Sequence, residues 1–343
     1  MIQRITTNCI RIAVVIIIPL LFITGCSQDA DRTSFLLGTI CRIQINGGDN
    51  SDLDAAFNCI RQIESRMSRN KETSEVRKIA SGGDDGFKVS PGPCQVIKRA
   101  LDFGHLSGGL FDVTIAPVVD LWGFGNNDVD PHLPSESALK QALPLVDYQQ
   151  IQVQEDCRVV TGPGQRIDLG GIAKGYAADE AAKVLRKSGV KSALINLGGN
   201  LFVLGKKDNG KPWKFGIQDP LKPTGTMMGI IEIDSGALVT SGIYERFFEE
   251  NGKKYHHIID PNTGYPVKNN LAGVSITAPS GLDADALSTA VFMLGIDKGC
   301  ELLAQFPNTG AIFITKNGEI TTYGIASARF NLTNQDYRVV GRK

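Results

Sequence analysis

The chain of 343 residues is 42% hydrophobic and 21% charged, enough apolar material to fill the core of one large domain or two smaller ones. Its 36 lysine and arginine residues balance its 36 aspartate and glutamate residues, so the formal net charge is zero. The sequence has no basic stripe of the kind that binds nucleic acid, and we expect no nucleic-acid partner.

The first 25 residues have the pattern of an export signal. Arg4 and Arg11 are the only charged residues before Asp29, and an apolar run over 12–23 follows them. This run is shorter than the roughly 20 apolar residues that span a bilayer, whereas a basic start and a short apolar segment are typical of a secretory signal. The predicted organisation is a signal peptide over 1–25, a flexible tether over 26–34 and a folded domain over 35–343.

The first half of the folded domain combines strands with amphipathic helices. Apolar residues from Leu53 to Met67 recur at helical spacing, which predicts a helix over 52–67 with one buried face. Ser135 is placed to cap a further helix that ends before Pro144. The other expected elements are strands over 35–45, 151–153 and 159–161, a helix over 95–106, a buried strand leading to Trp122 and a loop over 122–134.

In the second half, Gly170-Gly171 precede a predicted helix whose Ala177 and Leu185 face inward, and Gly189 stands where such a helix ends. Ser241 is expected in a loop that enters a strand. Strands and helices without regular alternation predict an α+β fold in a single large domain. The later elements are strands over 192–197, 201–204, 229–233, 255–259, 273–277, 311–315 and 319–323, a hairpin turn at 316–318, and a helix over 284–294 with Asp283 as N-cap.

The seven cysteines show no metal-binding spacing. Cys9 belongs to the predicted signal, and the others form neither a Cys-x-x-Cys pair nor a Cys/His cluster, so we expect no zinc site. Export would permit a disulfide, but we favour small buried thiols. The cysteines concerned are Cys41, Cys59, Cys94, Cys157 and Cys300.

Two stretches combine oxygen ligands with glycines. Asp285 and Thr289 are four residues apart on a predicted helix, so they share one face, with Ser288 beside them. Carboxylate and hydroxyl oxygens suit Mg²⁺ or Ca²⁺, although the same residues could simply complete and pack a helix. The stretch DLGGIAKG, Asp168 to Gly175, places paired glycines before a helix N-terminus. That arrangement favours an anion such as a pyrophosphate, although a plain glycine turn has the same sequence.

Two more stretches carry aromatic, acidic and imidazole groups. Phe111-Asp112 follow a glycine pair and precede Trp122, an arrangement that could stack a planar ring or form an aromatic core. The stretch HHIIDPNTGYP, residues 256–266, ends a predicted strand in a tight turn. The side chains of His257 and Asp260 in this stretch either stabilise the turn through local hydrogen bonds or face a ligand.

Taken in order, these stretches resemble the FAD:protein FMN transferase family, the ApbE-like flavin transferases. Leu110 stands where the family usually has alanine, and Met67-Ser68 is followed by Arg-Asn-Lys instead of a tyrosine-containing run. The matching blocks cover nearly the whole mature chain: Met67-Ser68, Leu110 to Gly125, Asp168 to Gly175 (DLGGIAKG), Asn196 to Gly199 (NLGG), Thr240 to Gly242 (TSG), His257 to Pro261 (HIIDP) and Ala284 to Ala290 (ADALSTA).

The resemblance implies an enzyme that transfers FMN from FAD to a threonine hydroxyl of a partner protein and releases AMP, with Mg²⁺ as its metal. Catalysis is expected at His257 and Asp285. An imidazole or carboxylate must take the threonine proton, and of the candidates His257, Asp260 and Asp285 we prefer His257 as general base. The resemblance assigns metal binding to the Gly171 carbonyl, Asp285, Ser288 and Thr289. It assigns FAD binding to Met67, Leu110, Phe111, Asp112, Asp168, Lys174, Ser241 and Ile259.

Residues Ile23-Thr24-Gly25-Cys26 resemble the lipobox of bacterial lipoproteins, which implies lipidation of Cys26. We therefore expect an exported, membrane-anchored protein that faces the periplasm or cell exterior and acts on a subunit of a membrane redox complex. Position 27 is serine, whereas an aspartate after the lipidated cysteine commonly retains lipoproteins at an inner membrane, so the sequence is compatible with an outer-membrane location. Two alternatives share the same site: a Mg²⁺-dependent hydrolase that passes FMN to water, and a FAD-binding lipoprotein without chemistry.

Overall fold

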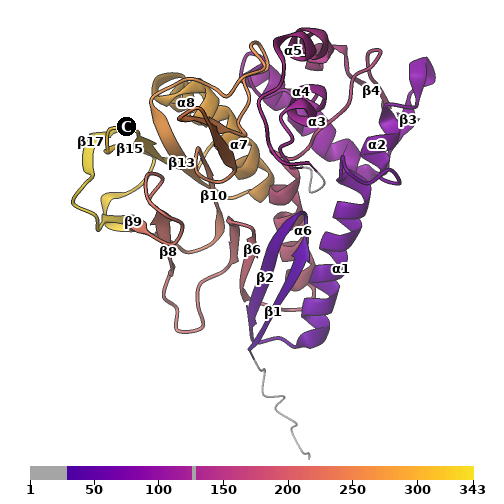
Figure 1. Cartoon of the computed structure of the whole chain (residues 1–343). Helices are drawn as coiled ribbons and strands as arrows, with labels where there is room; N and C mark the ends of the chain where they lie inside the picture. Colours follow the sequence, from indigo (N-terminus) through magenta and orange to yellow (C-terminus); the bar gives the residue numbers. More distant parts are fainter. Residues whose placement is uncertain (1–28, 126–128) are drawn as a thin grey trace, which may run out of the picture.

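A nine-stranded sheet forms the centre of the molecule (Figure 1). The computed structural model describes residues 29–125 and 129–343. Neighbouring strands run antiparallel, except for the parallel pair β15 and β17 at one edge. In order across the sheet, the strands are β1 (Ala30–Leu36), β2 (Thr39–Asn46), β6 (Ser192–Leu197), β7 (Asn200–Leu204), β10 (Gly236–Gly242), β13 (Leu271–Ala278), β14 (Gly310–Thr315), β15 (Glu319–Tyr323) and β17 (Arg338–Arg342).

Both faces of the sheet are buried in its middle strands, where side chains alternate between one face and the other, whereas β1 and β2 expose one face. In β14, Ala311 and Phe313 point into the larger core, whereas Ile312 and Ile314 point into a second core on the opposite face. A largely antiparallel sheet with its own helical layer confirms the predicted α+β fold.

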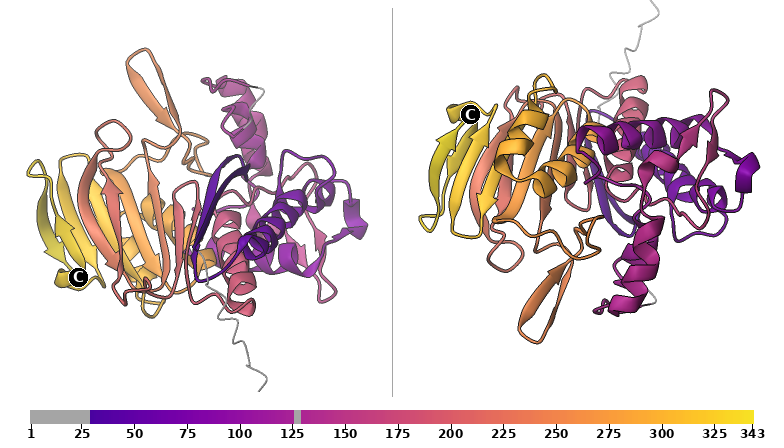
Figure 2. Two further views of the ribbon diagram at one scale, coloured as in Figure 1. Left: turned by 90° about the horizontal axis from the view of Figure 1, so that it is seen from below. Right: turned by 90° about the horizontal axis from the view of Figure 1, so that it is seen from above.

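Helices cover one face of the sheet (Figures 1 and 2). The helix α1 (Asn50–Met67) begins at Asp49, whose side chain accepts hydrogen bonds from the first turn, and it buries the apolar stripe that the sequence predicted. The helix α7 (Gly281–Leu294) is buried on nearly every side, between α6 and the strands β10 and β13. The other helices of this side are α2 (Glu75–Ile79), α3 (Pro91–Leu106), α6 (Ala173–Lys187) and α8 (Ile296–Leu303).

A three-stranded sheet made of β16 (Phe330–Leu332), β9 (Met227–Ile233) and β8 (Trp213–Gln218) supplies apolar side chains to the second core. A third cluster surrounds Trp122 and joins α4 (Ala116–Leu121) and α5 (Glu136–Ala142) to the hairpin of β11 (Phe247–Glu250) and β12 (Lys253–His256). Figure 2 shows this hairpin projecting from the body of the molecule. The remaining elements are β3 (Phe87–Lys88), β4 (Gln152–Val153), β5 (Arg158–Val160) and the 3₁₀ turns η1 (Gly83–Asp85), η2 (Leu143–Leu145), η3 (Tyr148–Gln150) and η4 (Ser327–Arg329).

The beginning of the domain differs from the sequence prediction. Residues 35–45 form no single strand, because the chain reverses at Leu37 and Gly38, both with positive φ, and makes the β1–β2 hairpin. The folded part also begins earlier than predicted: β1 starts at Ala30, so the end of the expected tether is paired with β2.

Three further predictions were wrong in detail. The segment before Trp122 is the helix α4 instead of a buried strand, with a proline in its first turn, where the missing N–H breaks no hydrogen bond. The N-cap of α7 is Ser280, which accepts a hydrogen bond from the Asp283 N–H. Ser241 lies at the end of the strand β10 instead of in a loop before a strand.

The expectation of unpaired thiols fails at one pair of cysteines. Cys94 in α3 and Cys157 beside β5 form a disulfide, with Cα atoms 5.5 Å apart and a sequence separation of 63. The pairing of β3 with β5 brings the two segments together. Cys41, Cys59 and Cys300 are free thiols, as predicted.

The predicted signal peptide and the lipidation of Cys26 fall outside the described residues. Within the part of the chain that the structure describes, no helix has both the length and the apolar character needed to cross a membrane.

Candidate functional site

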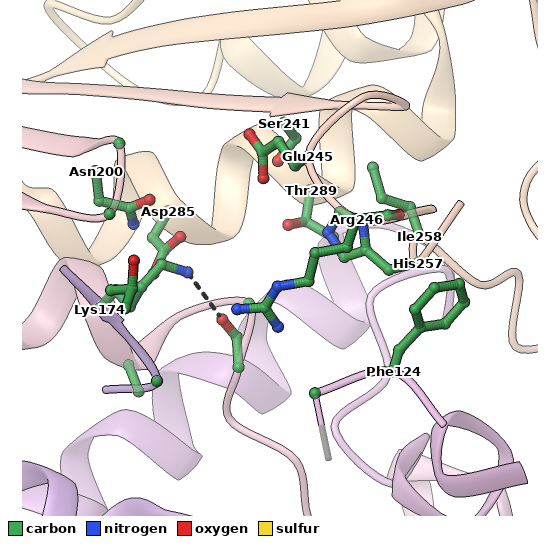
Figure 3. Close-up of a pocket in the computed structure, with 18 of the residues that line it drawn as sticks. Phe124, Lys174, Asn200, Ser241, Glu245, Arg246, His257, Ile258, Asp285 and Thr289 are labelled. Carbon is green, nitrogen blue, oxygen red and sulfur yellow. Dashed lines mark hydrogen bonds between the residues drawn. The ribbon is translucent and has the colours of Figure 1, made fainter. Parts of the chain in front are cut away.

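A cavity of about 1190 Å³ gathers motifs that are far apart in the sequence (Figure 3). Its walls come from the β1–β2 turn, the end of α1, the loops around residues 110–125 and 168–174, the β6–β7 turn, and the segments after β10 and β12. Ser288 alone among the predicted catalytic, metal-binding and FAD-binding residues does not line it. The others do: Met67, Leu110, Phe111, Asp112, Asp168, Gly171, Lys174, Ser241, His257, Ile259, Asp285 and Thr289.

One wall of the cavity is the contact between α6 and α7. A carboxylate oxygen of Asp285 accepts a hydrogen bond of 2.9 Å from the backbone N–H of Gly175. The helices approach so closely that a Cβ on Gly175 would lie 2.0 Å from the Gly281 carbonyl oxygen, so only glycine fits. Asp285 is only 3% exposed, and its carboxylate is therefore held in one place by helix packing.

Thr289 lies one turn beyond Asp285 and faces the double-glycine loop. A Cβ on Gly171 would lie 3.6 Å from the Thr289 hydroxyl oxygen and 3.1 Å from the ring of Phe111. Gly171 therefore lets the loop backbone approach α7 without an intervening side chain.

Ser288 points away from this loop. Its hydroxyl donates to the Asp285 carbonyl oxygen at 2.8 Å and pairs with the Ser241 hydroxyl at 2.8 Å. Both residues are buried, so the pair ties the end of β10 to α7. The resemblance grouped Ser288 with the metal ligands, but its hydroxyl bonds to Asp285 and Ser241 within the protein.

The donor set of this wall fits Mg²⁺. Asp285, Thr289 and the Gly171 carbonyl offer one carboxylate, one hydroxyl and one carbonyl oxygen, all hard donors. The described residues contain no group of three or more histidine, cysteine, aspartate and glutamate side chains suited to a metal. Mg²⁺ is commonly bound by one or two carboxylates together with waters and substrate phosphates, so a site with one carboxylate suits it better than zinc.

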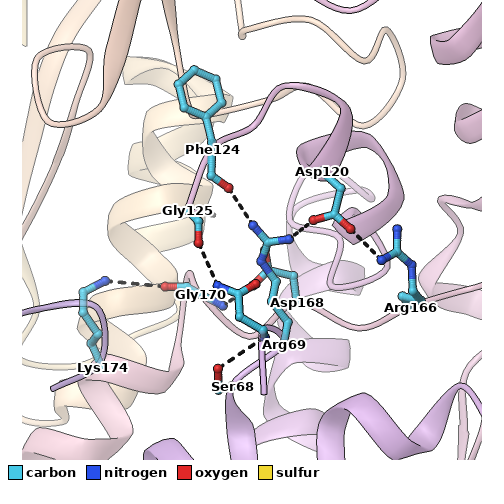
Figure 4. A network of polar contacts seen from close by, with 10 residues as sticks. Ser68, Arg69, Asp120, Phe124, Gly125, Arg166, Asp168, Gly170 and Lys174 are labelled. Carbon is cyan, nitrogen blue, oxygen red and sulfur yellow. Dashed lines mark hydrogen bonds and ion pairs between the residues drawn. The ribbon is translucent and has the colours of Figure 1, made fainter. Parts of the chain in front are cut away.

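The double-glycine loop is held by a network centred on Arg69 (Figure 4). The Arg69 guanidinium lies 3.1 Å from an Asp168 carboxylate oxygen, donates to the Phe124 carbonyl oxygen at 2.6 Å, and pairs with Asp120. The second Asp168 oxygen accepts from the Gly170 N–H at 2.8 Å. Both carboxylate oxygens of Asp168 therefore have partners within the protein, and these contacts fix the shape of the loop.

Asp112 is likewise satisfied within the protein. Its carboxylate accepts from the Thr114 N–H at 2.7 Å, the Thr114 hydroxyl at 2.6 Å and the Tyr148 N–H at 3.0 Å. Burial raises the pKa of Asp112, and these hydrogen bonds oppose the rise. The structure thus places Asp112 at the cavity wall, where it fixes the loop that carries Leu110 and Phe111.

His257 faces the cavity beside Arg246 and Phe124 (Figure 3). Burial, followed by the charge of Arg246, lowers the pKa of His257 to about 3, so the imidazole is neutral near pH 7. Its Nδ1 lies 3.3 Å from the Arg246 carbonyl oxygen, which can only accept, so a hydrogen bond there places the proton on Nδ1. The lone pair on Nε2 is then available to take a proton.

Charged groups that the sequence prediction missed also line the cavity. Arg246 adds its positive charge to that of Lys174, and both favour an anionic ligand. Glu245 is exposed to the cavity, and desolvation by the surrounding protein raises its pKa to about 7. Arg69 and Asn200 directly follow motif blocks, and Glu245 and Arg246 lie three and four residues after Gly242, so proximity to a motif was the available signal.

Comparisons with known proteins identify the family of the chain. Residues 37–313 match a family model described as the ApbE family. A FAD:protein FMN transferase of Treponema pallidum is 35% identical over 308 residues, which are 84% of this chain and 84% of the relative. One of Klebsiella pneumoniae is 34% identical over 313 residues, which are 90% of this chain and 96% of the relative.

Solved structures show the same fold. The ApbE protein of Thermotoga maritima superposes with a TM-score of 0.78 at 33% identity, covering 85% of this chain and 96% of that one. The flavin transferase ApbE of Vibrio cholerae superposes with a TM-score of 0.76 at 26% identity, covering 84% and 94%.

Proposed function

The chain belongs to the ApbE family, and we propose that it transfers FMN from FAD to a threonine hydroxyl of a partner protein and releases AMP. The observation that carries this proposal is the cavity itself, where the cations Lys174 and Arg246 meet a hard-oxygen donor set and a neutral imidazole. Its volume of about 1190 Å³ is sufficient for a dinucleotide.

The metal is proposed to be Mg²⁺, held by Asp285, Thr289 and the Gly171 carbonyl oxygen. When bound, it would neutralise negative charge on the phosphates as the phosphoryl bond changes partners. Ser288 is proposed to act indirectly, by holding Ser241 and the backbone of α7 in place.

The protein's own residues orient the dinucleotide and move one proton. The threonine oxygen forms a bond to the phosphorus of the FMN half, and the bond from that phosphorus to the bridging oxygen breaks, so the bridging oxygen leaves with AMP. Lys174 and Arg246 are placed to stabilise the added negative charge. His257 Nε2 is proposed to take the threonine hydroxyl proton.

The flavin end of FAD is proposed to contact the apolar part of the wall, formed by Met67, Leu110, Phe111 and Ile259. Asp112 and Asp168 would support this wall through the loops that they hold, because their carboxylates already have protein partners. Ser241 lies at the α7 side of the cavity, where the phosphates would be.

The protein is also proposed to be an exported lipoprotein anchored through Cys26, with a membrane redox-complex subunit as its acceptor. The Cys94–Cys157 disulfide supports export, because disulfides persist in oxidising compartments.

Incubation with FAD, Mg²⁺ and a threonine-bearing subunit of a membrane redox pump tests the function. Transfer leaves flavin fluorescence on the acceptor in a denaturing gel, and changing the acceptor threonine to alanine removes it. Free FMN without labelled acceptor would indicate hydrolysis instead, and unchanged FAD would indicate binding without chemistry. Either result would contradict the proposed transfer.

A further inference from the structure

Asn200 is the first residue of β7, directly after the turn formed by Gly198 and Gly199. It lines the cavity and is 5% exposed. Figure 3 shows its side chain on the same side of the cavity as Lys174 and Asp285. It lies outside the motif block that ends at Gly199, and no role follows for it from the resemblance.

The side-chain Nδ2 of Asn200 is buried and has no hydrogen-bond partner in the described part of the chain. Buried amide groups are nearly always hydrogen-bonded, and an unpaired one destabilises the folded state. The partly buried Asn269 shows the usual arrangement, because its Nδ2 donates to the Phe292 carbonyl oxygen at 2.6 Å.

The position itself would suit an apolar residue. Side chains two residues apart on a strand share a face, so Asn200 shares its face with Phe202 and Leu204. Both of these belong to the larger core on the helical side of the sheet. An unpaired asparagine at this position therefore destabilises the folded state. A ligand that accepts a hydrogen bond from its amide would explain why the residue is present.

We propose that Asn200 is a ligand-binding residue whose Nδ2 donates a hydrogen bond to a pyrophosphate oxygen of FAD. The inference rests on the proposed function. Asp285 marks the metal-binding wall and Lys174 supplies a cation, so the ligand atoms expected beside Asn200 are anionic oxygens. A neutral amide adds a directed hydrogen bond there without adding charge.

Two variants separate ligand binding from packing. Asn200→Leu keeps the approximate size and removes the donor, and Asn200→Asp keeps the shape and adds a negative charge. Dissociation constants for FAD, ADP and riboflavin are measured by calorimetry, and melting temperatures are measured on the ligand-free protein. ADP contains a pyrophosphate without a flavin, and riboflavin contains the flavin without a phosphate.

We expect Asn200→Leu to weaken FAD and ADP binding by about tenfold and to leave riboflavin binding unchanged. Asn200→Asp should weaken both nucleotides further through charge repulsion. The ligand-free Asn200→Leu protein should melt at the same or a higher temperature, because it no longer buries an unpaired donor. Asn269→Leu is the matched control: Asn269 donates to the Phe292 carbonyl oxygen at 2.6 Å, so its loss should lower the melting temperature and leave FAD affinity unchanged.

Unchanged FAD and ADP affinity in both Asn200 variants would overturn the inference. So would a lower melting temperature together with equal losses for all three ligands, which would indicate packing. If Asn200→Leu does not fold, the ratio of ADP to riboflavin affinity in Asn200→Asp decides the question. Failure of the unaltered protein to bind FAD would instead contradict the proposed function.

Discussion

The carboxylate of Asp285 on α7 accepts a hydrogen bond from the backbone N–H of Gly175 on α6. This contact joins the packing of two helices to the proposed metal site. The residue that would bind the cation is positioned by a backbone group, and that group is accessible only because residue 175 has no side chain.

Replacing Asp285 with asparagine should abolish most activity without unfolding the protein. The amide oxygen of asparagine can still accept from Gly175, but it lacks the charge that attracts Mg²⁺. We expect FMN transfer to fall roughly 100-fold or more at saturating FAD. Transfer rates measured across a Mg²⁺ titration check this.

Asp283→Asn is the matched control, because Asp283 lies in the first turn of the same helix and pairs with Arg99 at 2.8 Å. It should retain activity. A normal transfer rate in Asp285→Asn would show that the metal binds elsewhere.

Replacing His257 with glutamine should slow transfer by roughly 100-fold, the lower end of the range for loss of a general base, because a group with a pKa of about 3 is a weak base near pH 7. FAD affinity should change little, because the step affected is proton removal. Because the pKa of His257 is about 3, this residue stays neutral between pH 5 and 8 and should contribute no inflection to the pH–rate profile in that range. Single-turnover transfer rates across this range, for both proteins, provide the measurement.

His256→Gln should retain activity and serves as the control, because its side chain packs against Phe292 and is absent from the cavity wall. An equal loss in both variants would assign the effect to the turn rather than to proton transfer.

His256 should make stability fall in acid. Burial, followed by the charge of Lys316, lowers its pKa in the folded protein to about 4 from 6.5. The unfolded chain therefore binds more protons below pH 6.5, so this contribution is complete above pH 6.5 and is lost as the pH falls toward 4. The loss should reach about 3 kcal/mol in the free energy of unfolding.

Urea unfolding of the unaltered protein and of His256→Gln at several pH values tests this. The difference between their pH dependences isolates the histidine. Parallel curves for the two proteins would refute the assignment.

Loss of the Cys94–Cys157 disulfide should destabilise the protein. The bond closes a loop of 63 residues, which corresponds to about 4 kcal/mol in the chain-entropy description. Melting temperatures of the Cys94→Ser/Cys157→Ser double variant provide the measurement. Cys41→Ala is the control, since that thiol is free. The idea fails if the reducing agent dithiothreitol and the double substitution both leave the melting temperature unchanged.

Sequence patterns correctly predicted the elements that have a clear hydrophobic period, and they were less reliable for short apolar runs and for turns. The stripe from Leu53 to Met67 has one clear period, and the buried face of α1 follows it. The run before Trp122 is short and rich in apolar residues, and such a run suits a buried strand as well as a short helix. The reversal at Leu37 and Gly38 was hidden because a leucine takes a positive φ there, which local preferences disfavour.

The site was predictable where chemistry is concentrated in motifs, and less so where it depends on contacts across the fold. The resemblance brought Asp285, Thr289 and Gly171 together, and all three line one cavity. Arg69 holds Asp168 across about 100 residues of sequence, and no spacing rule predicts that pair. Nor does sequence distinguish Ser288, which bonds within the protein, from Thr289, which faces the cavity.

The β1–β2 hairpin sets the reach of the enzyme if Cys26 carries a lipid, as proposed. β1 begins only four residues after Cys26, a span of at most about 14 Å, and its seven residues rise about 23 Å to the turn that borders the cavity. Its substrate threonine would then have to stand a few tens of ångströms above the bilayer. Inserting a long Gly/Ser spacer after Ser27 should let the membrane-bound enzyme modify acceptor threonines at greater heights above the bilayer. If the enzyme shows the same preference for acceptor height with and without the spacer, the length of β1 does not limit which acceptors it reaches.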